Sequence, residues 1–330
     1  MADSGQSFYS VLVLPLPEKA LIRRIRSQIS ARSNMKTGIG DDCAVLRVPS
    51  GHELLVTTDF SLEDVHFRRK WHPAEAVGHR CLTRGLSDIA AMGGEPIAAF
   101  LSLALPAKIP QKWVDQFMAG LLKLAEKFKV PLAGGDTAQS PDKILADIVV
   151  VGTIPKGKAI LRSGARSGDL IYVTGELGGS SATLDLLRSG KKLRAANFPR
   201  HFHPVPRLEV GGFLRERGLA SAMIDTSDGL STDLGHICEE SGVGAEIEAS
   251  AIPRDQIGRR PALVELKYAL HGGEDYELLF TTRPRVKVPS QIAGVPITQI
   301  GRATRANKVS LVNQGRRSIL NPQGWQHFQK

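Results

Sequence analysis

Short stretches that combine glycine or hydroxyl residues with aspartate recur along the chain, beside the ends of apolar, strand-like runs. They constrain the fold most, because glycine lets the backbone approach a ligand closely and aspartate offers the hard oxygen atoms that Mg²⁺ prefers. One such stretch is more often an ordinary acidic turn. Five in one chain predict a site for a metal-bound polyphosphate. In order they are GIGDDC (38–43), TTD (57–59), SD (87–88), GGDT (134–137) and DTSDG (225–229).

The composition indicates a cytosolic α/β protein with room for two domains. The chain has 330 residues, 42% of them hydrophobic, and 33 glycines, as expected for a loop-rich α/β fold. No apolar run approaches the ~18 residues of a membrane span, and residues 1–7 lack the layout of a signal peptide. Cys43, Cys81 and Cys238 are odd in number and far apart, which argues against a zinc site and a disulfide framework.

The net charge of +10 does not by itself indicate a nucleic-acid partner. Basic residues are scattered in pairs and short runs, and aromatic residues make up only 5% of the chain, so platforms for base stacking are absent. We therefore expect neither a nucleic-acid nor a membrane partner. The positive field would instead attract small anionic molecules.

The first half of the chain alternates predicted helices and strands. Helices are expected over 18–29, 73–89 and 110–128, where apolar residues recur at helical spacing. The runs 44–48 and 53–58 predict a β-hairpin that ends at Asp59. Further strands are expected over 100–105, 130–133 and 147–153. Exposed sheet edges in this half lead us to expect a homodimer.

A stretch rich in proline, glycine and lysine, 155–169, marks the predicted boundary between domains 1–155 and 156–330. The second domain repeats the α/β pattern, with strands over 170–174, 222–224 and 276–282 and helices over 206–217, 230–241 and 261–270. Residues 191–206 are polar and contain proline, so we expect a surface loop there. The predicted fold class is α/β (α+β), with an N-terminal β-sheet domain that dimerises and a C-terminal α/β domain.

Residues 152–159, GTIPKGKA, match the phosphate-binding pattern G-x-x-x-x-G-K. However, Ala159 stands where a serine or threonine would hold Mg²⁺, and glycines interrupt the sequence that follows. A true P-loop opens a helix. We therefore reject this match.

Six aspartates fall at the ends of predicted elements, and gathering them in one place would be unfavourable without cations. Such a cluster suits phosphoryl transfer, in which metal ions absorb the developing charge. Thr57, Thr58 and Ser227 add hydroxyls that can hold metal or phosphate. No motif for a nucleophile or a dinucleotide site is present. The six aspartates are Asp42, Asp59, Asp88, Asp136, Asp225 and Asp228.

Six motifs together resemble the thiamine-monophosphate kinase family, over nearly the whole chain. They are GIGDDCAVL (38–46), TTDFSLEDVHF (57–67), LSDIAAMGGEP (86–96), GGDT (134–137), IDTSDGLSTDLGHI (224–237) and GGEDYELLF (272–280). The resemblance implies a fold like that of aminoimidazole ribonucleotide synthetase. It also implies transfer of a phosphoryl group from ATP to thiamine monophosphate, with several Mg²⁺ ions and no protein nucleophile.

The resemblance further implies roles for individual residues. Metal ligands would be Asp42, Thr57, Thr58, Asp59, Asp88, Asp136, Asp225 and Asp228. ATP would contact Gly135, Asp136, Arg162 and Ser227. Thiamine monophosphate would contact His66, Glu274 and Trp325.

Other interpretations remain open from the residues alone. A single histidine such as His66 is often packed structurally, and Trp325 could simply fix the C-terminus. The nearest alternative function is that of another ATP-using enzyme of the same superfamily with a different small acceptor. A non-catalytic regulator and a nucleic-acid binder are more distant alternatives.

Overall fold

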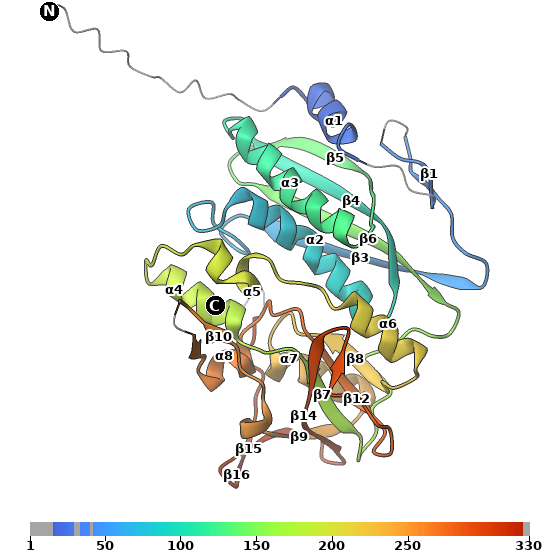
Figure 1. Ribbon diagram of the computed structural model, residues 1–330, viewed down its shortest axis with the longest axis vertical. Coiled ribbons are helices and arrows are strands. Elements are labelled where there is room, and N and C mark those ends of the chain that lie inside the picture. The colour runs from blue at the N-terminus through green and yellow to red at the C-terminus, as the bar shows by residue number, and fades with distance from the viewer. Residues whose placement is uncertain (1–15, 30–33, 40–41, 260, 326–330) are drawn as a thin grey trace, which may run out of the picture.

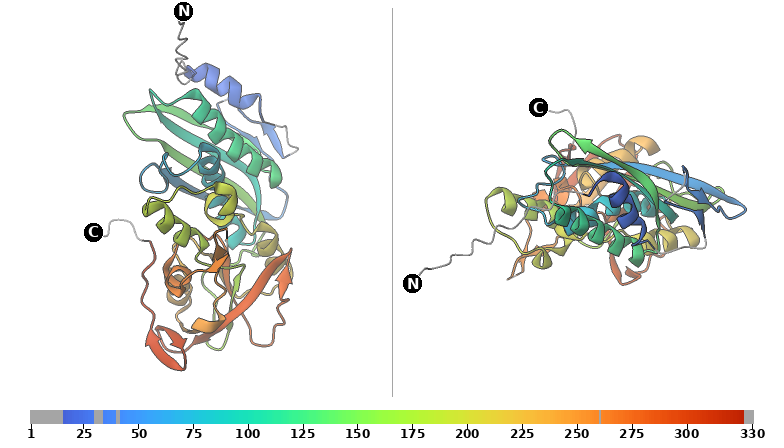
Figure 2. Two further views of the ribbon diagram at one scale, coloured as in Figure 1. Left: turned by 60° about the vertical axis from the view of Figure 1, so that its left-hand side comes forward. Right: turned by 90° about the horizontal axis from the view of Figure 1, so that it is seen from above.

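The computed structural model describes residues 16–29, 34–39, 42–259 and 261–325. Gly40 and Asp41 of the first acidic loop, and the tail from residue 326, lie outside this part. Two main sheets, one from each half of the chain, lie towards opposite ends of the long axis (Figures 1 and 2). This mixed arrangement confirms the predicted α/β class. No helix in the described ranges is long and apolar enough to cross a membrane.

The N-terminal sheet has four strands in the order β3-β6-β4-β5. β6 pairs antiparallel with both β3 and β4, whereas β4 and β5 are parallel. Two long helices, α2 and α3, lie over one face of this sheet, and α1 lies near its β5 edge (Figure 1). The bounds are α1 Glu18–Arg26, β3 His52–Leu62, α2 Ala74–Ala91, β4 Glu95–Pro106, α3 Gln111–Lys127, β5 Leu132–Ser140 and β6 Leu145–Pro155.

The predicted hairpin of 44–48 with 53–58 is wrong. The strand β2 (Val45–Leu46) pairs with β1 (Met35–Thr37), and β3 pairs instead with β6 along its whole length. Pro49 lacks a backbone N–H and cannot extend β2 in a ladder, while the eleven residues of β3 can all pair with β6. β2 is thus outside the N-terminal sheet, whose four strands are β3, β6, β4 and β5.

Helix α2 is the structural centre of the molecule. Fifteen of its eighteen residues are buried, as expected for a helix surrounded by protein. One side packs on α3 and the N-terminal sheet, and another contacts α6 (Leu208–Glu216) and β8 (Ala222–Asp225) of the second half. Residues on α2 can thus contact both halves of the chain.

The C-terminal sheet runs in the order β16-β15-β9-β14-β7-β12-β8, with β13 paired to β14. β8 and β12 are antiparallel, and Asp225 lies opposite Leu278. The acidic turn after β8 therefore lies beside the turn before β12. The strands are β7 Leu170–Thr174, β9 Gly244–Glu248, β12 Leu278–Thr282, β13 Gln291–Ile292, β14 Val295–Thr304, β15 Val309–Asn313 and β16 Arg316–Ile319, and the helices are α4 Gly179–Arg188 and α7 Leu230–Ser241.

Two predictions for this half need correction. Residues 191–206 are not a plain surface loop, because they form η1 (Ala195–Asn197) and α5 (Pro199–Phe202) and bury Phe198 and Phe202 against Leu187. The phenylalanines are four residues apart and share one face, which the polar composition of the segment concealed.

The helix predicted over 261–270 is restricted to α8 (Leu266–His271). Ala262–Leu263 form β11, which pairs with β10 (Gln256–Ile257) around a turn at Gly258. Positive φ at Gly258 favours that turn. The rejection of the P-loop match is confirmed, since Gly152 lies within β6 and residues 156–169 contain no helix.

Candidate active site

A cavity of about 410 Å³ lies between α2 and the two acidic turns of the C-terminal half. We call it the central cavity. A smaller cavity of about 260 Å³ shares Asp88 and Asp225 with it and adds Thr57 and Arg162. Most of the residues singled out from the sequence meet here. Those that line the central cavity are Asp59, His66, Asp88, Asp225, Ser227, Asp228, Glu274 and Trp325.

Side chains from both halves of the chain are hydrogen-bonded to one another at this site. Thr57 and Asp59 are two residues apart on β3, so their side chains lie on the same face of the strand, the one turned towards α2. The Thr57 hydroxyl donates to Asp88 of α2. The neighbouring hydroxyl of Ser87 donates to Asp225 at 2.6 Å. This bond directly connects α2 with the end of β8.

The turn after β8 opens helix α7 at the cavity. Gly229 has φ +121°, and a Cβ atom there would approach the His271 carbonyl carbon to 2.9 Å, so the turn requires glycine. Its N–H donates to Asp233 at 2.9 Å. The predicted strand, acidic turn and helix are confirmed. Among the described residues, potential metal-ligand atoms of Asp228, Asp233 and His236 lie within 4.8 Å of one another.

Three aspartates that line the central cavity, Asp59, Asp88 and Asp225, have raised pKa values. Burial, with a smaller effect of Asp88, raises the pKa of Asp225 to about 7. Burial also raises the pKa of Asp59 to about 6, although the charge of Arg84 opposes it. A bound cation would remove this penalty on the ionised forms. The donors are hard oxygen atoms, so the residues fit Mg²⁺.

Sequence reasoning missed the cations that balance this site. Arg80, Arg84 and Asp88 follow one another at intervals of four along α2, and this spacing was the signal that could have revealed them. Arg84 Nη1 lies 3.7 Å from Asp59 Oδ1, and the buried Arg84 Nε has no hydrogen-bond partner within the described part of the chain. Both arginines form ion pairs with Glu274.

Glu274 combines these ion pairs with an unusual backbone conformation. Its φ of +64° lies in the left-handed region, which is strained for a residue with a side chain. Burial acts to raise its pKa, but Arg80 and Arg84 outweigh that effect and hold the pKa below its ordinary value. Glu274 therefore presents an ionised carboxylate at the cavity.

A second group of predicted residues lies elsewhere. Asp42, Gly135 and Asp136 line a separate cavity of about 550 Å³ beside β5. Gly135 is required there, because its φ is +145° and a Cβ atom would lie 1.8 Å from the Leu101 carbonyl oxygen. The β-ladders align Gly135 with Asp59 three strands away, which corresponds to about 14 Å. Within one chain, the residues at this cavity are therefore distant from those at the central cavity.

Thr58 faces away from Asp59, as expected for consecutive residues of a strand. Its hydroxyl donates to Asp147 at 2.7 Å. The half-buried His66 lines the central cavity, and its Nδ1 accepts a hydrogen bond from the Leu62 N–H at 2.9 Å. Trp325 also lines the cavity with 48% exposure, while its backbone N–H donates to the Asp228 carbonyl at 3.1 Å.

Comparisons with known proteins agree on one family. AIR synthase related protein, N-terminal domain, matches residues 40–154, and AIR synthase related protein, C-terminal domain, matches residues 166–314. The chain is 37% identical over 324 residues to a thiamine-monophosphate kinase from Salmonella typhimurium, covering 94% of this chain and 98% of the relative.

Solved structures give the same result. A crystal structure of thiamine-monophosphate kinase from Stenotrophomonas maltophilia superposes with a TM-score of 0.79 at 34% identity, covering 91% of this chain and 97% of the other. AaThiL complexed with AMPPCP and TMP superposes with a TM-score of 0.75 at 32% identity, covering 94% and 96% of the two chains.

Proposed function

The chain belongs to the thiamine-monophosphate kinase family of the AIR synthase related proteins, and on this basis we propose that it transfers the γ-phosphoryl group of ATP directly to thiamine monophosphate, giving ADP and thiamine diphosphate. The observation that carries the proposal is the central cavity, where acidic motifs of both halves meet. A similar chain, AaThiL, binds AMPPCP and TMP together.

Several Mg²⁺ ions belong to the proposal, and when bound they would neutralise charge on the phosphate oxygens. The half-buried Asp59 and the buried Asp225 support it, because carboxylates with raised pKa values would be ionised most easily beside cations. Arg84 would offset part of the remaining negative charge. The proposed metal ligands are Thr57, Asp59, Asp88, Asp225 and Asp228 at the central cavity and the adjoining smaller cavity, together with Thr58, Asp42 and Asp136, of which the last two line the separate cavity beside β5.

For ATP, the proposed contacts are Gly135, Asp136, Arg162 and Ser227. For the acceptor, they are His66, Glu274 and Trp325. The ionised Glu274 suits the cationic thiazolium ring of thiamine, and Trp325 offers an aromatic face for a cation–π contact. The reaction uses no protein nucleophile, because the attacking group is the phosphate of the acceptor itself.

A homodimer formed through the N-terminal sheet is also part of the proposal. The face of β3 that is turned away from α2 exposes Leu54, Val56 and Phe60, which are 52%, 66% and 52% accessible. An apolar patch of this kind on a sheet is typical of an interface, and a second copy could cover it.

A boundary between domains 1–155 and 156–330 is supported by the absence of strand pairing between the two main sheets among the described residues. Use of ATP agrees with the expected cytosolic location.

The test is a coupled assay of ADP release with ATP and Mg²⁺, using thiamine monophosphate and thiamine as alternative acceptors. We expect saturable ADP release with thiamine monophosphate, matched mole for mole by thiamine diphosphate, and little release with thiamine. Absence of acceptor-dependent ADP release would refute the proposal. Efficient turnover of a different acceptor would favour the alternative, another small-molecule phosphotransferase or synthetase of this superfamily.

A further inference from the structure

The segment 191–206 forms part of the wall of the central cavity. His201, in α5, is only 1% exposed, yet it lines the cavity together with His72 and Ser180. Its neighbour Phe202 is completely buried and packs edge-on against the His201 ring. A segment with the composition of a surface loop therefore places a histidine beside the site proposed for the acceptor.

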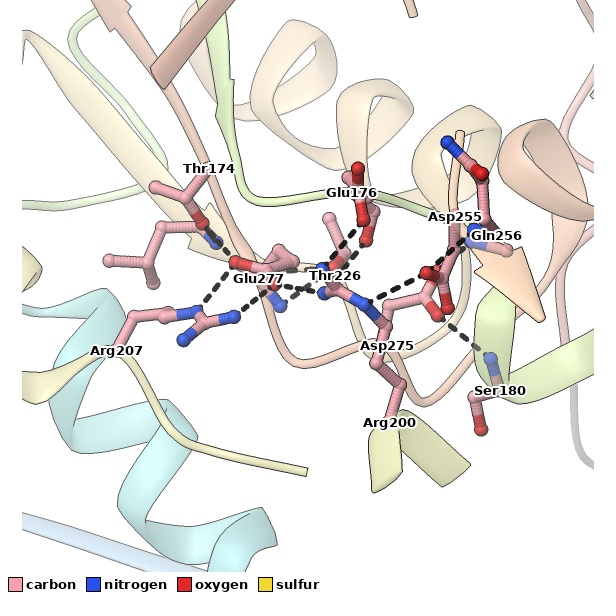
Figure 3. Close-up of polar contacts among 12 residues, drawn as sticks. Thr174, Glu176, Ser180, Arg200, Arg207, Thr226, Asp255, Gln256, Asp275 and Glu277 are labelled. Carbon is pink, nitrogen blue, oxygen red and sulfur yellow. Dashed lines mark hydrogen bonds and ion pairs between the residues drawn. The ribbon is translucent and has the colours of Figure 1, made fainter. Parts of the chain in front are cut away.

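Two arginines, Arg200 and Arg207, fix this stretch of chain to the rest of the C-terminal half (Figure 3). Arg200 donates to the fully buried Glu277 at 3.0 Å and lies 3.2 Å from Asp255. Arg207 approaches Glu277 from another side, with its Nε at 2.7 Å. Glu277 follows Glu274 by only three residues. These ion pairs therefore hold the backbone around His201 close to the turn before β12, which carries Glu274.

The His201 backbone and ring also contact Arg80 on α2. Arg80 donates to the His201 carbonyl at 2.6 Å, and the same guanidinium nitrogen is 3.5 Å from Nδ1. Ser180 Oγ lies 3.0 Å from Nδ1, and His72 Nε2 lies 3.0 Å from His201 Nε2. These contacts on both ring nitrogens fix the imidazole, and the imidazole in turn fixes the carbonyl that accepts from Arg80.

We propose that Arg80 is a positioning residue for acceptor binding and that His201 sets its orientation. The inference rests on the proposed function, since it concerns the carboxylate assigned to the acceptor. Arg80 is almost completely buried behind Glu274 and binds one of its carboxylate oxygens, while Arg84 binds the other. Arg84 also pairs with Asp59. Without Arg80, the carboxylate would be attracted by Arg84 alone and would move towards the Asp59 side of the cavity, away from the acceptor.

The test compares KM values for the two substrates. Arg80→Gln removes the second ion pair but leaves Glu274 compensated by Arg84, so folding should survive. We expect a KM for thiamine monophosphate raised about tenfold or more, which corresponds to about 1.4 kcal/mol, with the KM for ATP changed less than about twofold. Arg80→Lys should recover part of this loss. His201→Gln should change the same KM in the same direction, by a smaller factor.

A matched control is available on the same segment. The ring of His203 packs edge-on against His79, with centroids 5.1 Å apart. His203→Gln should leave both KM values unchanged. Equal increases in both KM values for Arg80→Gln, or no change in either, would overturn the inference. If Arg80→Gln does not fold, His201→Gln decides by the same comparison.

Calorimetric titration of the apo protein with thiamine monophosphate separates this inference from the proposed function. A wild type that binds thiamine monophosphate but does not turn it over would refute the kinase proposal. In that case a larger dissociation constant for Arg80→Gln than for wild type would still support the positioning role of Arg80. Equal dissociation constants for wild type and Arg80→Gln would overturn it. A wild type that neither binds nor turns over thiamine monophosphate would overturn both.

Discussion

Replacing Glu277 by glutamine tests whether the ion pairs of Figure 3 hold the C-terminal half together. Glu277 is completely buried and contacts Arg207 Nε at 2.7 Å, Arg200 at 3.0 Å and the Thr174 hydroxyl at 2.5 Å. Glu277→Gln keeps the size of the side chain and removes its charge. Two arginine side chains, 28% and 16% exposed, then lose their shared partner.

The expected cost follows from these contacts. Removing one partner of a buried ion pair costs about 3–5 kcal/mol. The partial exposure of the two arginines places the cost near the lower end, at about 3 kcal/mol, because water can solvate them. At roughly 2–4 °C per kcal/mol, the melting temperature should fall by about 6–12 °C. Arg200→Gln should cost less, because Glu277 keeps Arg207 and Thr174.

The assay is thermal and urea unfolding followed by circular dichroism, with wild type, Glu277→Gln and Arg200→Gln measured side by side. The predicted order of stability is wild type, then Arg200→Gln, then Glu277→Gln. A loss below about 1 kcal/mol for Glu277→Gln would place it with ordinary surface substitutions and refute the reasoning. So would a greater loss for Arg200→Gln than for Glu277→Gln.

Three further predictions concern activity and assembly. Chelation with EDTA should abolish turnover, and added Mg²⁺ should restore it. Asp59→Asn should lower kcat by roughly 10²-fold or more, because a metal ligand is lost. A near-normal kcat for this variant would show that Asp59 is not part of the site. Lys158→Ala should leave kcat/KM within a few-fold, whereas a loss of several orders of magnitude in a folded variant would mean that the 152–159 match is a true phosphate loop. Light scattering should give twice the chain mass of 35.7 kDa for wild type and the monomer mass for Val56→Asp combined with Phe60→Asp; a monomeric wild type at micromolar concentration would contradict the dimer.

Elements with strong local signals were predictable from the sequence. Helix α2 could be placed because its apolar residues recur at helical spacing between a proline and two glycines. The turn at 225–229 could be placed between a strand and a helix, because glycine and aspartate interrupt two apolar runs. Both signals depend on residues close together in the chain. Most of the acidic residues they carry lie in one cavity.

Features that depend on distant partners were not predictable in the same way. β3 pairs with β6, about a hundred residues further on, in preference to the adjacent β2, and no local pattern encodes that choice. The burial of His201 depends on Ser180 and His72, which local composition does not reveal. Nor does the sequence indicate that Asp136 would lie in a different cavity from Asp59. That separation follows from the order of strands in the sheet.

The central claim is that one site, built from both halves of the chain, holds Mg²⁺ and ATP. A thermal shift assay with Mg²⁺ and a non-hydrolysable ATP analogue tests it most directly, because a ligand at ~100-fold its dissociation constant stabilises by about 2.7 kcal/mol. We expect a clear rise in the melting temperature of wild type. The double variant Asp225→Asn, Asp228→Asn should lose most of that rise, while its apo form melts at nearly the same temperature as wild type or higher, because repelling carboxylates are gone. An undiminished rise in the double variant would contradict the claim, since the acidic turn of the C-terminal half would then contribute nothing to the bound nucleotide.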